Sequence, residues 1–205
     1  MKNKFLIGLL VLSTAGLIFY SLSTGNSDEG YFNELTKERQ EKDTFMKNSE
    51  QSPFGDERST FSGLKYFEPD ANFRVYAQLE PIKDKKVIIL PTSTGEENRY
   101  LEYAFAAFEM GGVENRLLLL EVMDMGPTRG TLFLSFADET STKETYGAGR
   151  YLDVKKIPAA TSIELDFNKA YNPYCAYTDK FSCPLPPREN VLKIAIRAGE
   201  KSYDK

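Results

Sequence analysis

Two segments in the last third of the chain combine the residue types that build polar sites in proteins. They span residues 136–153 and 165–187, and both mix acidic, amide, arginine and tyrosine side chains with strand-like apolar residues. Because successive side chains of a strand point to opposite faces, polar residues at alternate positions line one face of a sheet. We therefore expect one polar cleft built on a sheet, with six candidate ligand-binding residues: Asp138, Tyr146, Arg150, Asp166, Asn168 and Tyr171.

Arg150 directly follows Gly147-Ala148-Gly149, so a planar cation lies beside a backbone that a ligand can approach closely. In a binding site, Arg150 would hold a carboxylate or phosphate through two parallel hydrogen bonds. The alternative is an internal ion pair with Asp138, Asp153 or Asp166 that only fixes the turn. The sequence leaves both interpretations open.

The strand period places Asp166 and Asn168 on one face and Leu165 and Phe167 on the other. If the apolar face enters the core, the polar pair faces solvent or a cleft. Tyr171 follows in a Pro-punctuated loop that would serve as a binding wall. Asparagine in such a loop is equally able to cap a turn through its own backbone.

The chain has no histidine among its 205 residues, and this absence excludes several types of catalytic and metal site. It excludes Ser-His-Asp and Cys-His hydrolases and histidine-ligated zinc, and no phosphate-binding glycine motif is present. The net charge of −4, without any basic run, argues against nucleic acid as a partner. No metal and no cofactor is expected.

These limits leave two hypotheses of different kinds. The leading one is a non-catalytic domain that binds a small anionic or sugar-like ligand, or acts as a scaffold, at the cleft around Arg150. The second is a histidine-free hydrolase or lyase with Asp138 or Asp166 as base, Tyr146 as acid and Arg150 as electrostatic stabiliser. A protein partner bound through exposed aromatic side chains is a further possibility.

Cys175 and Cys183 are the two cysteines of the chain, with seven residues between them. In an exported domain they form a candidate disulfide, whose loop closure is worth about 2.5 kcal/mol in the chain-entropy model. Two thiols alone cannot complete a zinc site.

The N-terminus indicates export. Lys2 and Lys4 precede an uncharged run from Phe5 to Leu22, which is long enough, at about 27 Å, to cross most of a membrane. We expect residues 1–22 to be a membrane anchor that leaves the remainder facing the periplasm or exterior. The alternative is a signal peptide that is cleaved to give a secreted or periplasmic protein. Residues 23–30 would be a tether and residues 31–205 a single, mostly β domain.

Within that domain, the charge spacing predicts one amphipathic helix from Tyr31 to about Glu50. Short apolar runs separated by turn residues predict strands after it. The run Tyr100–Met110 is compatible with a helix, but Gly111-Gly112 after it favours a hairpin. The fold class is therefore mainly β, an antiparallel β-sandwich or half-open barrel. Its expected strands are Phe73–Glu80, Val87–Leu90, Tyr100–Met110, Arg116–Met123, Thr131–Phe136, Tyr151–Val154, Ser162–Phe167 and Val191–Arg197.

The two polar segments resemble a bacterial and archaeal family known as domain of unknown function 1684. The likeness is densest over Phe133–Asp153 and Ile163–Lys201, and weaker over Phe61–Phe67. The family pattern usually has glycine where this chain has Thr142, so the turn at that position is expected to differ. The resemblance implies a family but no function.

Overall fold

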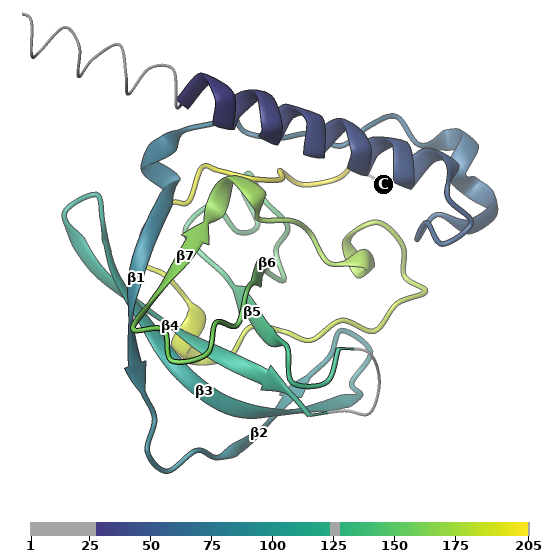
Figure 1. The fold of residues 1–205 in the computed structure, drawn as a ribbon. Helices are drawn as coiled ribbons and strands as arrows, with labels where there is room; N and C mark the ends of the chain where they lie inside the picture. Colours follow the sequence, from purple (N-terminus) through teal and green to yellow (C-terminus); the bar gives the residue numbers. More distant parts are fainter. Residues whose placement is uncertain (1–27, 124–127, 205) are drawn as a thin grey trace, which may run out of the picture. The chain divides into compact units, whose positions relative to one another are not determined.

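The computed structural model describes residues 28–123 and 128–204 of the chain (Figure 1). Two compact units are distinguished, one that ends at Lys42 and one that spans Asp43–Lys205. The candidate anchor, residues 1–22, lies outside the described residues. Within the described part of the chain, no helix is both long and apolar enough to cross a membrane.

One long helix is confirmed, and it covers residues 28–48. Residues 28–30, which the sequence assigned to a tether, are already helical. The spacing of charges that predicted this helix is visible in the Lys37–Glu41 ion pair, whose atoms are 3.7 Å apart on exposed side chains. Such a pair at four-residue spacing adds a few tenths of a kcal/mol, about 0.3, to helix stability.

The second unit is built on one seven-stranded antiparallel sheet, which confirms the mainly β class and the half-open barrel. The order of six strands is β6-β5-β4-β3-β1-β7, and β2 pairs with β3 outside this path. Sequence-based boundaries agree with the structure to within about three residues. The strands are β1 (Arg74–Pro81), β2 (Val87–Pro91), β3 (Glu97–Met110), β4 (Val113–Val122), β5 (Leu132–Phe136), β6 (Arg150–Val154) and β7 (Ser162–Asp166).

The β3–β4 hairpin confirms that Tyr100–Met110 is extended. Met110 pairs with Val113 across Gly111 and Gly112, whose φ angles are +62° and +76°. Positive φ at both central residues defines the two-residue turn whose twist matches that of the strands, and glycine adopts it without strain. The ladder shifts register between Glu102 and Ala104, where β3 changes its neighbour from β2 to β1.

The main core lies on the inner face of this bent sheet. Leu117 and Leu119 of β4 are fully buried there, together with Leu134 and Phe136 of β5 and Leu165 of β7. The alternate residues Leu118 and Leu120 pack on the outer face in a second cluster with Leu90 and Tyr100. Both faces of β4 are therefore apolar, and this explains the continuous run Leu117–Leu120 in the sequence.

The two end strands of the sheet are brought together through the loop that follows β7. Tyr151 of β6 and Tyr171 exchange two backbone hydrogen bonds, of 2.8 and 2.9 Å. This isolated bridge links the ends of the sheet without a full ladder, so the barrel is only half closed.

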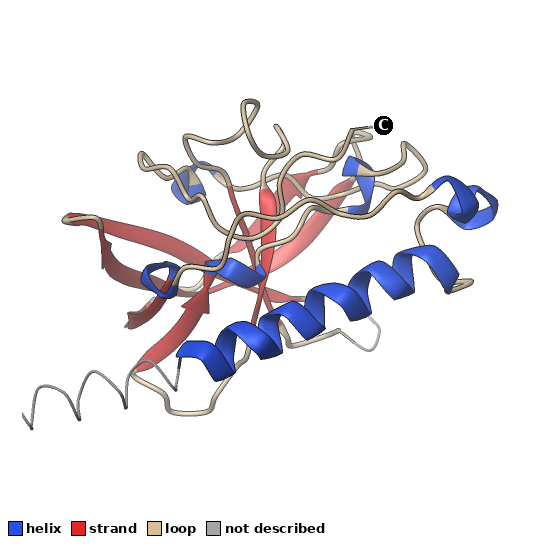
Figure 2. Ribbon diagram, turned by 90° about the horizontal axis from the view of Figure 1, so that it is seen from above, coloured by secondary structure: helices blue, strands red, loops and turns tan. Residues whose placement is uncertain are grey.

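The strand expected over Val191–Arg197 is wrong. After β7 the chain runs largely as loop, interrupted by short 3-10 helices (Figure 2): η3 (Phe167–Lys169), η4 (Tyr174–Ala176) and η5 (Arg188–Asn190). Residues 191–197 meet the sheet at a single bridge, Ala137 with Val191. Farther on, the Ile196 N–H donates to the Asp138 carboxylate rather than to a strand. Apolar alternation predicted the buried residues of this segment, but its backbone bonds to the Asp138 and Arg150 side chains and to the backbone of Ala137 and Glu139 rather than to a strand ladder.

Candidate functional site

Arg150 opens β6 and lies opposite Phe136 of β5. The glycine before it, Gly149, has a φ of +90°, and a Cβ there would lie 2.6 Å from the Phe136 carbonyl oxygen and 2.6 Å from Pro186 Cγ. Glycine is therefore required at this position by close packing of the protein on itself. The sequence had left open whether the glycines admit a ligand.

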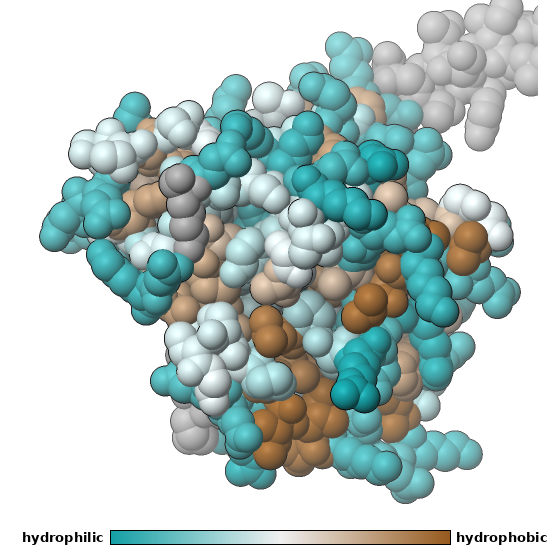
Figure 3. All heavy atoms as spheres, turned by 180° about the vertical axis from the view of Figure 1, so that it is seen from behind, coloured by the Kyte–Doolittle hydropathy of each residue, from teal (hydrophilic) through white to brown (hydrophobic). Residues whose placement is uncertain are grey.

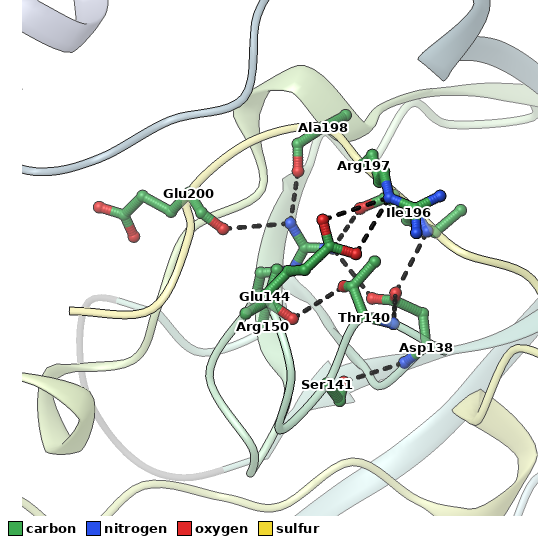
Figure 4. Close-up of polar contacts among 10 residues, drawn as sticks. Asp138, Thr140, Ser141, Glu144, Arg150, Ile196, Arg197, Ala198 and Glu200 are labelled. Atoms are coloured by element: carbon green, nitrogen blue, oxygen red, sulfur yellow. Dashed lines mark hydrogen bonds and ion pairs between the residues drawn. The ribbon is translucent and has the colours of Figure 1, made fainter. Parts of the chain in front are cut away.

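The Arg150 side chain is turned into the protein and is 1% exposed (Figure 4). Its Nη2 donates to Asp138 Oδ2 at 2.9 Å and to the Ile196 carbonyl at 2.8 Å. Its Nη1 donates to the carbonyls of Ala198 and Glu200, the latter at 3.2 Å. Burial lowers the pKa of Arg150, and the nearby Asp138 carboxylate opposes this shift. The geometry is that of the internal ion pair, one of the two alternatives that the sequence allowed.

Asp138 is the acceptor at the centre of this cluster. Besides the guanidinium, its Oδ1 accepts the N–H groups of Thr140, at 2.8 Å, and of Ile196, at 3.1 Å. The Asp138 side chain is also 1% exposed, so both charges are dry and both are hydrogen-bonded. Buried charges persist when most of their donors and acceptors are satisfied, and here Arg150 Nε is the one guanidinium nitrogen without a hydrogen-bond partner among the described residues.

The cluster fixes the segment of residues 194–201. Because Arg150 holds three alternate carbonyls, the side chains of Ile196 and Ala198 are buried and that of Arg197 points out. Arg197 Nε pairs with Glu144 Oε1 at 3.0 Å on the surface (Figure 4). The buried arginine therefore acts as a clamp on a loop whose outer residues remain accessible.

Glu200 is a buried acid that sequence reasoning missed. It is 0% exposed, and its carboxylate accepts the Tyr177 hydroxyl at 2.9 and 2.8 Å and the Asn172 N–H. Burial is the main cause that raises the pKa of Tyr177, and Glu200 raises it further. The only signal in the sequence was its place within the segment that resembles the family.

Asp166 and Asn168 form a second cluster, at the end of β7. The Asn168 amide brackets one residue, since Nδ2 donates to the Asp70 carbonyl at 2.8 Å and Oδ1 accepts the Asp70 N–H at 3.0 Å. Asp166 Oδ1 accepts the N–H of Asn168 at 3.1 Å and its Nδ2 at 3.2 Å. The pair thus holds the turn at Asp70. None of these hydrogen bonds involves Arg150 or its partners.

The hydroxyls of the two candidate tyrosines have different hydrogen-bond partners. The Tyr171 hydroxyl donates to Asp153 Oδ1 at 2.8 Å, and burial, with a further contribution from Asp153, raises its pKa. The Tyr146 hydroxyl donates to the Cys175 sulfur at 3.8 Å. The six predicted residues are therefore all in contact with protein groups, distributed over several clusters.

Asn190 is a second residue that sequence reasoning missed. It is 0% exposed, and its side chain lies between β4 and β5 just where their pairing stops. Its Oδ1 accepts the Leu118 N–H at 2.6 Å, and its Nδ2 donates to the carbonyls of Leu118, at 2.9 Å, and Ser135, at 2.8 Å. One side chain thus replaces a pair of ladder hydrogen bonds.

A surface groove lies between two segments: one is held by the Arg150–Asp138 cluster and the other by the Asp166–Asn168 pair. One hollow of about 610 Å³ and another of about 540 Å³ share Asp70, Phe73 and Ala195 in their linings, so they adjoin each other. The 194–201 segment, which Arg150 clamps, forms one wall, and the Asp70 turn, which Asn168 brackets, forms the other. The charged and aromatic side chains that line the hollow of about 610 Å³ are Phe67, Glu68, Asp70, Phe73, Arg197 and Lys201.

Elsewhere on the surface, hydrophobic side chains gather in the region of β2 (Figure 3). Val87 and Ile89 of this strand are 43% and 53% exposed. The most exposed aromatic side chain among the large hydrophobic residues, Tyr76 of β1, lies on a different strand. Within the described part of the chain, no three Cys, Asp or Glu side chains come together as a metal site would require.

The fold and its polar clusters define a half-open antiparallel barrel whose buried charges fix the loops around a surface groove. The chain belongs to the family described as protein of unknown function (DUF1684), whose model matches residues 59–201. This match confirms the resemblance seen in the sequence.

Among solved structures, the chain is similar to an uncharacterised protein of Haloarcula marismortui, determined by solution NMR. The two are 38% identical, with a TM-score of 0.64, and the match covers 86% of this chain and 96% of the other. The comparison with curated proteins returned no match.

Proposed function

We propose that this protein is a non-catalytic binding module for a small anionic or sugar-like ligand, which it takes up in the groove between residues 67–73 and 194–201. The observation that carries the proposal is the arrangement of the groove. Two cations and two aromatic rings lie along it, and a buried polar cluster holds each of its walls.

The groove offers the chemistry that such a ligand needs. The Arg197 side chain is 60% exposed, and its planar guanidinium suits a carboxylate or phosphate. Lys201 Nζ lies 4.8 Å from the centre of the Phe67 ring and adds a second cation. Phe73 offers a ring for an apolar sugar face, and the Asp70 carboxylate can accept sugar hydroxyls.

The buried clusters would contribute through preorganisation. A wall clamped by Arg150 at three carbonyls loses little conformational freedom when a ligand binds. Binding to a rigid site avoids the entropic cost of ordering loops, about 0.5–1.5 kcal/mol for each side chain immobilised. On this view Asp138, Arg150, Asp166 and Asn168 position the groove and do not touch the ligand.

The second candidate, a histidine-free hydrolase or lyase, draws no support from the contacts. A general base must reach the proton that it removes. The Asp138 side chain is 1% exposed and already accepts three donors, and the Arg150 guanidinium is equally enclosed. The Tyr146 hydroxyl is engaged with the Cys175 sulfur.

The location that we propose is the one expected from the N-terminal sequence, a membrane-anchored domain facing the periplasm or exterior. It rests on Lys2 and Lys4 and the uncharged run that follows them. Protease treatment of spheroplasts and of lysed cells tests it, because a domain on the outer side of the cytoplasmic membrane is digested in both. Protection in spheroplasts would contradict the proposed location.

The groove is tested by binding of defined probes to the purified domain: inorganic phosphate, citrate, galacturonate and chitin oligosaccharides. Calorimetry should detect at least one of them, and Arg197→Ala and Lys201→Ala should each weaken its binding about tenfold or more. Arg116→Ala is the matched control, since Arg116 also forms a surface ion pair, with Glu80 at 2.8 Å, but lies outside this groove.

The outcomes separate the hypotheses. Binding weakened by both groove variants and retained by the control supports the proposal. Binding that is equally strong in all the variants would place the ligand elsewhere. Conversion of a probe into product would favour the alternative hypothesis, a histidine-free hydrolase or lyase.

A further inference from the structure

Cys175 and Cys183 lie side by side beneath the surface. They are 6% and 7% exposed, and both are free thiols in the structure. The Cys175 N–H donates to the Cys183 sulfur at 3.2 Å, and the Cys183 N–H donates to the Ser93 hydroxyl at 3.2 Å. The two side chains also share a hydrogen bond with each other.

The surroundings of the two sulfurs differ. Cys175 receives the Tyr146 hydroxyl at 3.8 Å as well as the Cys183 thiol, so hydrogen bonds converge on its sulfur. Cys183 Sγ also accepts a donor, the Cys175 backbone N–H at 3.2 Å. The two sulfurs therefore differ in their donors, since a hydroxyl and the partner thiol act on Cys175 and a backbone N–H acts on Cys183.

The acid–base properties follow this geometry. The hydrogen bond from Cys183 is the largest cause that lowers the pKa of Cys175 to about 6, against the opposing effect of burial. The same bond raises the pKa of Cys183, and burial raises that of Tyr146 to about 12. The other titratable groups that act on this cluster are Tyr151 and Asp179.

We propose that Cys175 and Cys183 form a reversible dithiol–disulfide pair, in which Cys175 is the attacking sulfur and Cys183 the resolving one. The co-reactant is a small disulfide. The Cys175 thiolate attacks one of its sulfurs, forms a mixed disulfide and releases one thiolate. Cys183 then loses its proton and attacks the Cys175 sulfur, which releases the second thiolate. Two protein thiols are oxidised and one disulfide is reduced to two thiols.

Burial restricts the reagent. With 6% and 7% of the two residues exposed, a small molecule fits this site better than the disulfide of a folded protein. Oxidation would join η4 to the segment that follows β2, because Cys183 is held there by the Ser93 N–H, which donates to its carbonyl at 3.0 Å. The new bond would close the loop of residues 176–182.

The first test is the reactivity of the reduced, full-length protein toward monobromobimane from about pH 5 to about pH 9, with each site read by peptide mapping. Cys175 should label with a midpoint near pH 6 and Cys183 should label more slowly. In Cys183→Ala the midpoint of Cys175 should rise by at least one pH unit, since the largest stabilising hydrogen bond is lost. Tyr146→Phe should raise it by less.

The second test is oxidation by hydroxyethyl disulfide. The wild-type protein should lose two hydrogen atoms, gain a Cys175–Cys183 bond and return to the dithiol with dithiothreitol. Cys183→Ala should stop at a mixed disulfide on Cys175. Equal labelling of both thiols with a midpoint near pH 9 would overturn the proposal, and so would a native protein that forms no disulfide. The wild-type mapping decides the matter even if a variant fails to fold.

Discussion

The Arg150 guanidinium and the Asp138 carboxylate lie 2.9 Å apart, with both side chains 1% exposed. Moving two charges out of water costs several kcal/mol each, and their attraction offsets this only when the other hydrogen-bonding atoms are also satisfied. Here the Nη1 and Nη2 groups of Arg150 also reach three carbonyls of residues 196–200, Nε has no partner among the described residues, and Asp138 Oδ1 accepts two N–H groups. The ion pair therefore organises a loop that has no strand partner.

Replacing Arg150 by Met should lower the free energy of unfolding by about 3–5 kcal/mol, because the Asp138 charge would remain buried without a partner. Urea unfolding followed by circular dichroism measures the change. The control is Arg116→Met, which removes a pair that is 54% and 49% exposed and should cost less than about 1 kcal/mol. Equal losses in both variants would show that the buried pair has no special role.

Replacing Asn190 by Ala should cost about 3 kcal/mol. Its side chain makes three hydrogen bonds to β4 and β5, and their loss leaves buried backbone groups of Leu118 and Ser135 unsatisfied. Asn115→Ala is the control, since Asn115 makes one exposed bond to Val113, and it should cost below about 0.5 kcal/mol. Hydrogen exchange should also quicken at Leu118 in the first variant, and unchanged protection there would contradict the assignment.

Thr142→Gly should stabilise the protein by about 1 kcal/mol. Thr142 has a φ of +69°, a left-handed conformation that is strained for a β-branched residue and free of strain for glycine. Thr142 therefore has a backbone conformation that glycine, the residue of the family pattern at this position, adopts without strain. Thermal unfolding measures the gain, and Lys143→Gly, at a residue without positive φ, should instead lower the melting temperature. A loss of stability in Thr142→Gly would show that its side-chain contacts outweigh the strain.

Stability should fall steeply in alkali. Burial is the main cause that raises the pKa values of Tyr151, Tyr171 and Tyr177 above 10 in the folded protein. The unfolded chain loses these protons at about pH 10, so their contribution is fully present below that pH and is lost as the pH rises above it. Denaturant unfolding at about pH 8 and about pH 11 measures the difference, and tyrosinate absorbance should show these three groups ionising only on unfolding. Ionisation near pH 10 without unfolding would contradict the prediction.

The sequence alone determined the features that depend on neighbouring residues, namely the strands, the hairpin turn and the helix. Alternation of apolar residues and turn chemistry predicted eight strands, of which the structure has seven, together with the Gly111-Gly112 hairpin and the mainly β class. Side-chain period and glycine conformation are properties of neighbouring residues, so the sequence shows them directly. Charge spacing predicted a helix from Tyr31 to about Glu50 for the same reason, and the structure has it over residues 28–48. The resemblance to the family also required only the order of residues.

Tertiary structure decided what the polar residues do. Arg150 and Asp138 are clamped together, and Asn168 brackets Asp70 across nearly a hundred residues, so neither has the open position that composition suggested. Whether a charged side chain faces solvent or another charge depends on which distant segments meet in the fold. The residue pattern along one segment carries no information about these contacts. The same holds for Val191–Arg197, whose apolar period is that of a strand but whose hydrogen-bond partners are the side chains of Asp138 and Arg150 and the backbone of Ala137 and Glu139. Only the folded chain places those groups, and with them the groove that the buried charges support.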